Sequence, residues 1–360
     1  MPPRTCITFV FLTLFVLAST AGQAETLKTP VENSPDVIAL IDHGISLHDA
    51  GKYKEAIEKY KEAVKLNPDN PTAYYEIAMS YFALQDYKAA HKYAEKAAEF
   101  HQGSAIFVYV LLGNTADMIG KPEDAIEAYD RGLRLQPNNY LLLYNKGYLY
   151  TRQSESGKAI ECYKKAVSVN PNHPSSHAAL AQEYERQNYH IPCILAYCRF
   201  FALEPNTRRA AQLLPAFQRL LTLGVEKQSD SVINVDVSMS APDFDGDFTG
   251  VNLLLALSAA SRHIDDNKDK PPVELIYEDL NSIFSMMDVD DSTKEHTGFV
   301  WEYYAPYFGE MYRREYVRAF VYHMFQLSED RAIQSWLTEN EEQVNDFLIW
   351  STEYEFKSGD

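Results

Sequence analysis

The chain has 360 residues, of which 46% are hydrophobic, so it is long and apolar enough to bury the cores of two domains. Its formal net charge of −18 lies in the second half, because residues 226–360 hold 10 Lys and Arg against 28 Asp and Glu, while residues 25–225 hold 22 against 23. Acidity of this size argues against DNA, RNA or an anionic membrane surface as a partner.

The first 24 residues have the three-part pattern of a secretory signal peptide. Arg4 and the amino terminus supply positive charge, an apolar run extends from Cys6 to Ala18, and small residues follow up to Ala24. The apolar run is too short to span a bilayer comfortably. We therefore expect cleavage near Ala24 and export of the mature protein to the periplasm or the medium. Residues 25–36 form a leader segment before the next pattern begins.

A pattern of 34 residues then occurs five times. The copies span 37–70, 71–104, 106–139, 140–173 and 174–207, and Ala105 is the single slip in register. The pattern has small residues at positions 8 and 20, an aromatic residue near position 24 and proline at position 32. In the first copy these are Gly44, Ala56, Tyr60 and Pro68. A fixed period of this length is typical of a helical solenoid.

Each copy is expected to form two short helices, A and B, because small residues allow close backbone approach and the proline ends helix B. The pattern resembles the tetratricopeptide repeat family. Copy 2 departs from it with Gln102 in place of proline, and copy 5 departs with Cys193 and Phe200 where alanine is usual. Residues 208–224 are expected to form a capping helix, which Pro215 should kink or delay.

The resemblance implies an all-α fold: a right-handed α-α superhelix of five tetratricopeptide repeats, followed by a separate helical C-terminal domain. It also implies a concave groove, lined by the A helices, that binds a protein or peptide segment. The groove positions correspond to Ile41, Ile45, Tyr75, Met79, Phe82, Val110, Asn114, Tyr144 and Tyr148.

Two interpretations of this apolar inner face stay open. It is either an exposed groove for a partner segment, or a surface that packs against a neighbouring copy or the chain's own C-terminal half. Ile41 and Ile45 occupy positions where a clamp for a chaperone's terminal carboxylate has Lys and Asn. We therefore expect no such adaptor, and we do not expect charge to drive binding.

The second half begins with a linker at residues 225–248, in which residues 233–239 could form a short strand. Residues 249–360 are expected to form an acidic α-helical domain of about five helices, including a long aromatic stretch that Pro306 must interrupt or kink. This domain either caps the array or holds a second partner. A further alternative is autoinhibition, with residues 299–325 or the linker lying in the groove.

Alternating carboxylates in the linker, Asp243, Asp245 and Asp247, are weak candidates for a calcium site. The EF-hand loop requires Gly and Glu where this chain has Phe248 and Leu254, so that motif is absent. The competing interpretation is an acidic turn that caps the helix after it.

The three cysteines after the signal are Cys162, Cys193 and Cys198. An odd number argues against a disulfide framework, so we expect buried free thiols, with Cys162 pairing with one of the others as the alternative.

Motifs typical of enzymes are missing: the sequence has no Gly-rich phosphate loop, no serine elbow and no His-Glu-x-x-His. We therefore expect an exported scaffold or adaptor without a cofactor. The alternative is an enzyme, or a metal- or ligand-binding protein, whose site lies in the acidic domain and which uses the repeats for docking.

Overall fold

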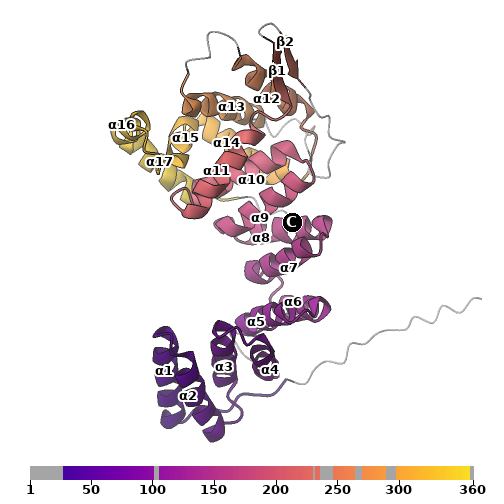
Figure 1. Cartoon of the computed structure of the whole chain (residues 1–360), viewed down its shortest axis with the longest axis vertical. Helices are drawn as coiled ribbons and strands as arrows, with labels where there is room; N and C mark the ends of the chain where they lie inside the picture. The colour runs from indigo at the N-terminus through magenta and orange to yellow at the C-terminus, as the bar shows by residue number, and fades with distance from the viewer. Residues whose placement is uncertain are drawn as a thin grey trace, which may run out of the picture.

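The computed structural model describes residues 27–100, 105–229, 232–235, 246–263, 270–288 and 297–356. The expected signal peptide lies outside these ranges. The described residues form helices α1 to α17 and one two-stranded hairpin. In Figure 1 the first helices form one end of the molecule, and the C-terminal helices gather around α9, α10 and α11 at the other end. The expected all-α fold is confirmed.

Ten helices form five antiparallel pairs, one pair for each expected copy. The A helices are α1 (Pro35–Asp49), α3 (Pro71–Ala83), α5 (Ala105–Met118), α7 (Tyr140–Arg152) and α9 (Pro174–Arg186). The B helices are α2 (Tyr53–Leu66), α4 (Tyr87–Ala98), α6 (Pro122–Leu135), α8 (Ser156–Val169) and α10 (His190–Leu203). Proline occupies the first turn of several of these helices. A backbone N–H at that position would have no carbonyl partner within the helix, so the absence of an N–H in proline costs no hydrogen bond. Asn70 and Asn139 cap α3 and α7 through their side-chain oxygens.

The described part of the leader segment lies along the ends of the first two repeats. The Lys28 N–H donates to the Glu99 carbonyl over 2.8 Å. Asn33 Oδ1 accepts from the side-chain amides of Asn67 and Asn70, at 2.9 and 2.8 Å. These contacts hold the leader against the turns that follow the B helices.

The helix after the last repeat, α11 (Arg208–Leu220), begins at the expected residue, and Pro215 lies inside it without delaying its start. It continues the repeat register and covers the end of the array. The hairpin of β1 (Val225–Ser229) and β2 (Val232–Val235) follows. The strand expected at residues 233–239 thus overlaps β2, and its second half lies outside the described residues.

The C-terminal half contains six helices among its described residues: α12 (Thr249–Ser261), α13 (Pro272–Met287), α14 (Phe299–Arg313), α15 (Val317–Met324), α16 (Arg331–Glu339) and α17 (Glu341–Glu353). Pro306 lies inside α14, so of the two effects expected of it the interruption is wrong and the kink stays a prediction. The interruption comes nine residues later, at Glu315, whose φ of 60° cannot continue a right-handed helix.

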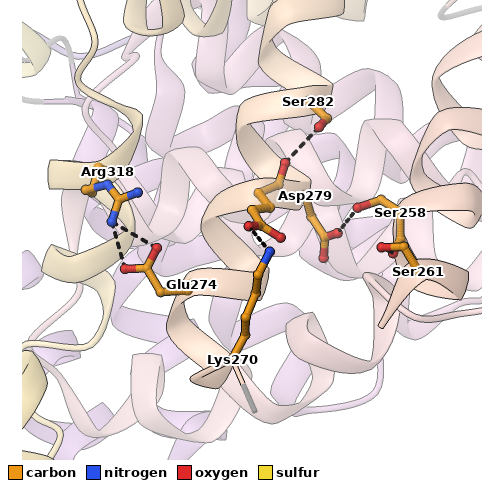
Figure 2. A network of polar contacts seen from close by, with 8 residues as sticks. Ser258, Ser261, Lys270, Glu274, Asp279, Ser282 and Arg318 are labelled. Atoms are coloured by element: carbon orange, nitrogen blue, oxygen red, sulfur yellow. Dashed lines mark hydrogen bonds and ion pairs between the residues drawn. The ribbon is translucent and has the colours of Figure 1, made fainter. Parts of the chain in front are cut away.

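Polar contacts join α13 to its neighbours, as Figure 2 shows. Glu274 accepts two hydrogen bonds from Arg318 of α15, at 2.7 and 2.9 Å. Asp279 is buried and accepts from Ser258 of α12 over 2.6 Å. Lys270 pairs with Glu278 over 2.5 Å. A buried carboxylate needs such partners, so these residues are accounted for by the packing of α12, α13 and α15.

Helix α10 is the centre of the C-terminal half of the molecule. Every residue from Ile191 to Ala202 is buried, whereas the B helices of other repeats expose one face. The reason is that α10 packs against α9 and α11 and also contacts α12, α14 and α15. A helix that is apolar all round must be covered all round, and α10 is covered in this way by helices before and after it in the chain.

One hydrophobic core therefore extends from repeats 4 and 5 into α12–α17. The helical C-terminal domain is present as expected, but its core is continuous with that of the array. Residues 299–325 pack on the outer side of repeats 4 and 5. The Tyr303 hydroxyl donates to the Val167 carbonyl of α8 over 2.7 Å, and the Tyr304 ring contacts the His177 ring of α9. Within the described residues, the autoinhibition alternative therefore has no support.

Arg199 lies at the centre of this continuous core and is fully buried. Its Nη1 donates to the Tyr307 hydroxyl at 3.0 Å and to Ser351 Oγ at 2.9 Å, and its Nη2 donates to Asn172 Oδ1 at 2.7 Å. The guanidinium also stacks on the rings of Tyr307 and Phe356. Among the described residues none of its partners is a carboxylate, so hydrogen bonds and aromatic faces stabilise the charge.

His177 is the neighbouring buried titratable group. Burial and the nearby charge of Arg199 lower the pKa of its imidazole to about 3. Its Nε2 lies 2.9 Å from the Pro171 carbonyl and its Nδ1 lies 2.7 Å from the Tyr304 hydroxyl. The carbonyl can only accept, so the neutral ring carries its proton on Nε2 and accepts at Nδ1.

Candidate functional site

A groove of about 480 Å³ lies on the inner side of repeats 4 and 5, between α7, α9 and α11. Its wall contains two of the residues expected there, Tyr144 and Tyr148. The Tyr148 side chain is exposed, with a relative accessibility of 51%. Tyr144 is half-buried and packs on the rings of Tyr163 and His173, at centroid distances of 5.9 and 5.2 Å. Two tyrosines thus form one wall, one of them fixed and the other open to solvent.

The floor of the groove is a buried hydrogen-bonded chain. Glu183 Oε1 accepts from the Thr151 hydroxyl over 2.5 Å and from Arg186 Nη1 over 2.7 Å. Thr151 Oγ1 is also 3.1 Å from the hydroxyl of Tyr163, whose pKa is raised by burial. The Glu183 side chain is only 1% exposed. The Glu183 carboxylate therefore fixes the positions of Thr151 and Arg186, and its neighbours shield it from solvent.

Arginines form the rim. Arg152 pairs with Asp117, Arg186 with Glu183, and Arg209 with Glu204. All three nitrogens of the Arg209 guanidinium are engaged: it donates to Glu204 through Nε and Nη2, and to Ser175 Oγ through Nη1 over 2.9 Å. The groove is thus of mixed character, with aromatic walls and a cationic rim, whereas the sequence predicted an apolar face.

The other expected groove residues lie elsewhere along the array. Ile41 is buried in the core of repeat 1 with Val37 and Ile57, so its side chain does not line a groove. The reason is reach: a short branched side chain at position 5 stays between neighbouring helices, whereas Tyr144 extends beyond them. Ile45 is exposed, with a relative accessibility of 37%.

The remaining four apolar residues, Tyr75, Met79, Phe82 and Val110, are half-buried and pack against the core of repeats 2 and 3. Asn114 accepts a hydrogen bond from the Tyr129 hydroxyl over 2.7 Å. Both interpretations left open for the inner face therefore apply in part: repeats 2 and 3 use it for packing between copies, and repeat 4 leaves it open.

Twelve of the fourteen lining residues are not among those that the sequence predicts, and they include Ser175, Gln182 and Arg186 of α9, and Arg209 and Gln212 of α11. The signal for most of these five is present. Ser175 and Gln182 are positions 2 and 9 of copy 5, and the same register continued into the cap places Arg209 and Gln212 at positions 2 and 5. Copy 5 matches the repeat pattern least well, and for this reason no groove residues are predicted in it from the sequence.

The acidic linker offers little to a metal ion in the described residues. Asp243 and Asp245 lie outside them. Asp247 Oδ1 accepts from the N–H and hydroxyl of Thr249, at 2.9 and 2.6 Å, at the start of α12. Across the part of the chain that the structure describes, no group of three or more His, Cys, Asp or Glu side chains could hold a metal ion. Asp247 thus bonds the first residue of α12 from the turn before the helix, whereas Phe248 is the N-cap residue and makes no side-chain cap.

The three cysteines are free thiols. Cys193 and Cys198 are buried in α10, and Cys162 is half-buried on α8. Burial raises the pKa of the Cys162 thiol to about 11, which makes it a poor nucleophile at neutral pH.

None of the described helices is long and apolar enough to cross a membrane.

Family models match the array. A model described as TPR repeat matches residues 44–85, and models described as tetratricopeptide repeat match residues 71–100, 108–139 and 140–173. Matches therefore fall within the first four expected copies.

Curated relatives are similar over less than half of the chain. The TPR repeat-containing protein MJ1428 of Methanocaldococcus jannaschii is 28% identical over 170 residues, which is 44% of this chain and 30% of that protein. The DnaJ homolog subfamily C member 3 homolog of Dictyostelium discoideum is 27% identical over 178 residues, 45% of this chain and 36% of that protein. A probable peptide N-acetylglucosaminyltransferase of Hordeum vulgare, SPINDLY, is 27% identical, and the match covers 16% of it. The chain thus spans about a third or less of these relatives.

Solved structures match a similar share of the chain. The crystal structure of MamA is 23% identical and covers 47% of this chain and 96% of its own, with a TM-score of 0.41. TTC0263, a thermophilic TPR protein of Thermus thermophilus, is 20% identical and covers 52% of this chain and all of its own, also with a TM-score of 0.41.

Proposed function

Because the chain is a tetratricopeptide repeat protein, we propose that it is an exported scaffold that binds a segment of a partner protein in the groove of repeats 4 and 5. The observation that carries the proposal is the groove itself, a hollow of about 480 Å³ with an exposed aromatic side chain, Tyr148, on its wall. Exposed aromatic rings beside hydrogen-bonding groups are typical of contact sites.

The C-terminal half supports this role from the other side. It packs on α8, α9 and α10 and holds the outer face of repeats 4 and 5, while the lining residues of the groove all come from α7, α8, α9 and α11. A groove whose walls are fixed in advance loses less conformational entropy when a partner binds. The acidic domain is therefore proposed as the support of the binding site.

A photo-crosslinking experiment tests groove binding. A benzophenone amino acid replaces Tyr148 in the full-length chain, and the matched control carries it at Glu161, an exposed residue of α8. We expect light-dependent adducts with a protein from position 148 and none from position 161. The further change Gln182→Trp, at an exposed lining residue, should remove the adduct because the indole fills the groove. Equal labelling from both positions would contradict groove binding.

Export is tested separately. When the full-length chain is produced in a secreting host, we expect mass spectrometry of the mature protein to find Glu25 at its amino terminus, because Gly22 and Ala24 fit the small residues before a cleavage site. A protein that retains residues 1–24 in the cytoplasm would show that the proposed export is wrong.

A further inference from the structure

The charges around the groove indicate what kind of segment it takes. We infer that the partner segment is extended and acidic, and that two of its side-chain carboxylates bind Arg152 and Arg186. This inference rests on the proposed function and makes it more specific. It differs from the expectation that charge does not drive binding.

The repeat register places these two arginines side by side. Both occupy position 13 of their copies, at the C-terminal ends of α7 and α9. The same position in copies 1, 2 and 3 is Asp49, Ala83 and Met118. The pair therefore occurs only in the two copies that form the groove.

The arginines are exposed and their acidic partners lie deeper. The side chains of Arg152 and Arg186 are 49% and 52% exposed, whereas those of Asp117 and Glu183 are 15% and 1% exposed. An entering segment therefore meets the guanidinium groups before it meets the carboxylates. The two arginines and their two acidic partners have a net charge of zero, so the net charge does not reveal that the positive groups lie nearer the solvent.

Each guanidinium keeps donors for a ligand. Arg152 and Arg186 bond their acidic partners through Nη1. A guanidinium has five N–H donors and can bind a second carboxylate through its other edge. Glu183 is the only carboxylate among the lining residues, and it is covered. A basic segment would therefore face two like charges with no accessible acid to compensate.

Geometry limits the spacing of the acids. Helices that pack directly lie roughly 8–10 Å apart, and α7 and α9 are in contact. An extended chain rises about 3.3 Å per residue. Carboxylates about three residues apart would therefore reach Arg152 and Arg186 together, and an apolar side chain between or beside them would lie against Tyr148.

The test uses a phage library of short random linear peptides, selected on the mature full chain. We expect enrichment of peptides with Asp or Glu about three residues apart, and binding that weakens as salt rises. Enriched peptides are then measured by calorimetry on three variants. Arg152→Gln, and the double variant Glu183→Gln with Arg186→Gln, should each weaken binding about tenfold or more, as expected for one charge-assisted contact. The double variant leaves no buried carboxylate without its cation.

The control is Arg134→Gln, which removes an exposed arginine paired with Glu127 on α6, away from the groove. It should leave the affinity unchanged. Acidic peptides that bind all variants equally, or an enriched set that is basic or purely apolar, would overturn the inference. If apolar peptides are enriched and lose affinity with Gln182→Trp, groove binding survives and only the acidic specificity fails. If no peptide is enriched, both fail.

Discussion

At the scale of single residues, the array depends on glycines that face tyrosine rings. Gly44, Gly113 and Gly147 occupy position 8, and the tyrosine at position 24 of the same copy fills the space beside each. A Cβ atom on Gly113 would lie 2.3 Å from Cε1 of Tyr129. That ring cannot withdraw, because it is buried and its hydroxyl is bonded to Asn114. The glycine is therefore required by packing, since its helical backbone would accept any residue.

The substitution Gly113→Ala tests which of two effects is larger. Helix propensity alone favours alanine by about 1 kcal/mol, whereas overpacking a filled core costs about 1–3 kcal/mol. We expect the clash to dominate and the free energy of unfolding to fall by up to about 2 kcal/mol, as measured by urea denaturation.

The control for this prediction is Gly157→Ala in α8, where a Cβ atom would meet nothing within 4 Å. That variant should gain a few tenths of a kcal/mol, less than the full propensity difference, because Gly157 lies in the first turn of α8. If Gly113→Ala proved as stable as Gly157→Ala, tight packing at position 8 would not be the reason for glycine.

At the scale of helices, the repeat register is enough to predict the helix pairs, the cap and two groove tyrosines. It cannot predict which inner residues stay open, because that depends on side-chain length and on the neighbouring copy, as Ile41 and Tyr144 show at the same position 5. The sequence predicts a break at Pro306, but Glu315 makes it, after the end of α14. Pro306 is the eighth residue of α14, so its position alone does not show that the helix continues through it, and the positive φ of Glu315 leaves no mark in the sequence.

The sequence of helix α10 indicates that the helix is covered on all sides, although the repeat register does not show this. It has one formal charge, Arg199, among largely apolar residues, so no face of the helix is polar enough to be exposed to solvent. As a sequence, copy 5 looks like a terminal copy, since end repeats are often atypical. In the structure α10 is covered by α9 and α11 and also by α12, α14 and α15 of the C-terminal half. Departures that turn a B helix apolar all round indicate that another part of the chain covers it.

At the scale of the whole molecule, the continuous core means that repeats 4 and 5 and the C-terminal half should unfold together. In an ordinary solenoid each repeat is stabilised only by its neighbours, and removing the next segment costs one interface. Here α10 also contacts α12, α14 and α15, and Arg199 bonds to Tyr307 and Ser351 of that half.

A chain that ends at Gly224 tests this coupling. It keeps all five repeats and α11, but it exposes the outer face of α10 and leaves Arg199 without Tyr307 and Ser351. Each apolar side chain uncovered costs about 1.5–3 kcal/mol, so losing cover from only a few lowers the free energy of unfolding by about 5 kcal/mol or more. For a fragment of this size that corresponds to a fall in Tm of roughly 10–20 °C, measured by far-ultraviolet circular dichroism.

The matched truncation removes repeat 1 and begins at Pro71. Among the described residues the core of repeat 1 is shared with repeat 2, through Ala73 and Ile77 of α3 and Tyr93 of α4, so this chain loses one nearest-neighbour interface and the transition of repeats 4 and 5 should keep its Tm. Equal shifts from the two truncations would mean that the C-terminal half contributes no more to stability than a repeat does.

The groove walls α7 and α9 pack on the same core that the C-terminal truncation opens. A larger fall in Tm from that truncation, together with loss of crosslinking from position 148, would therefore show that the acidic half maintains the groove.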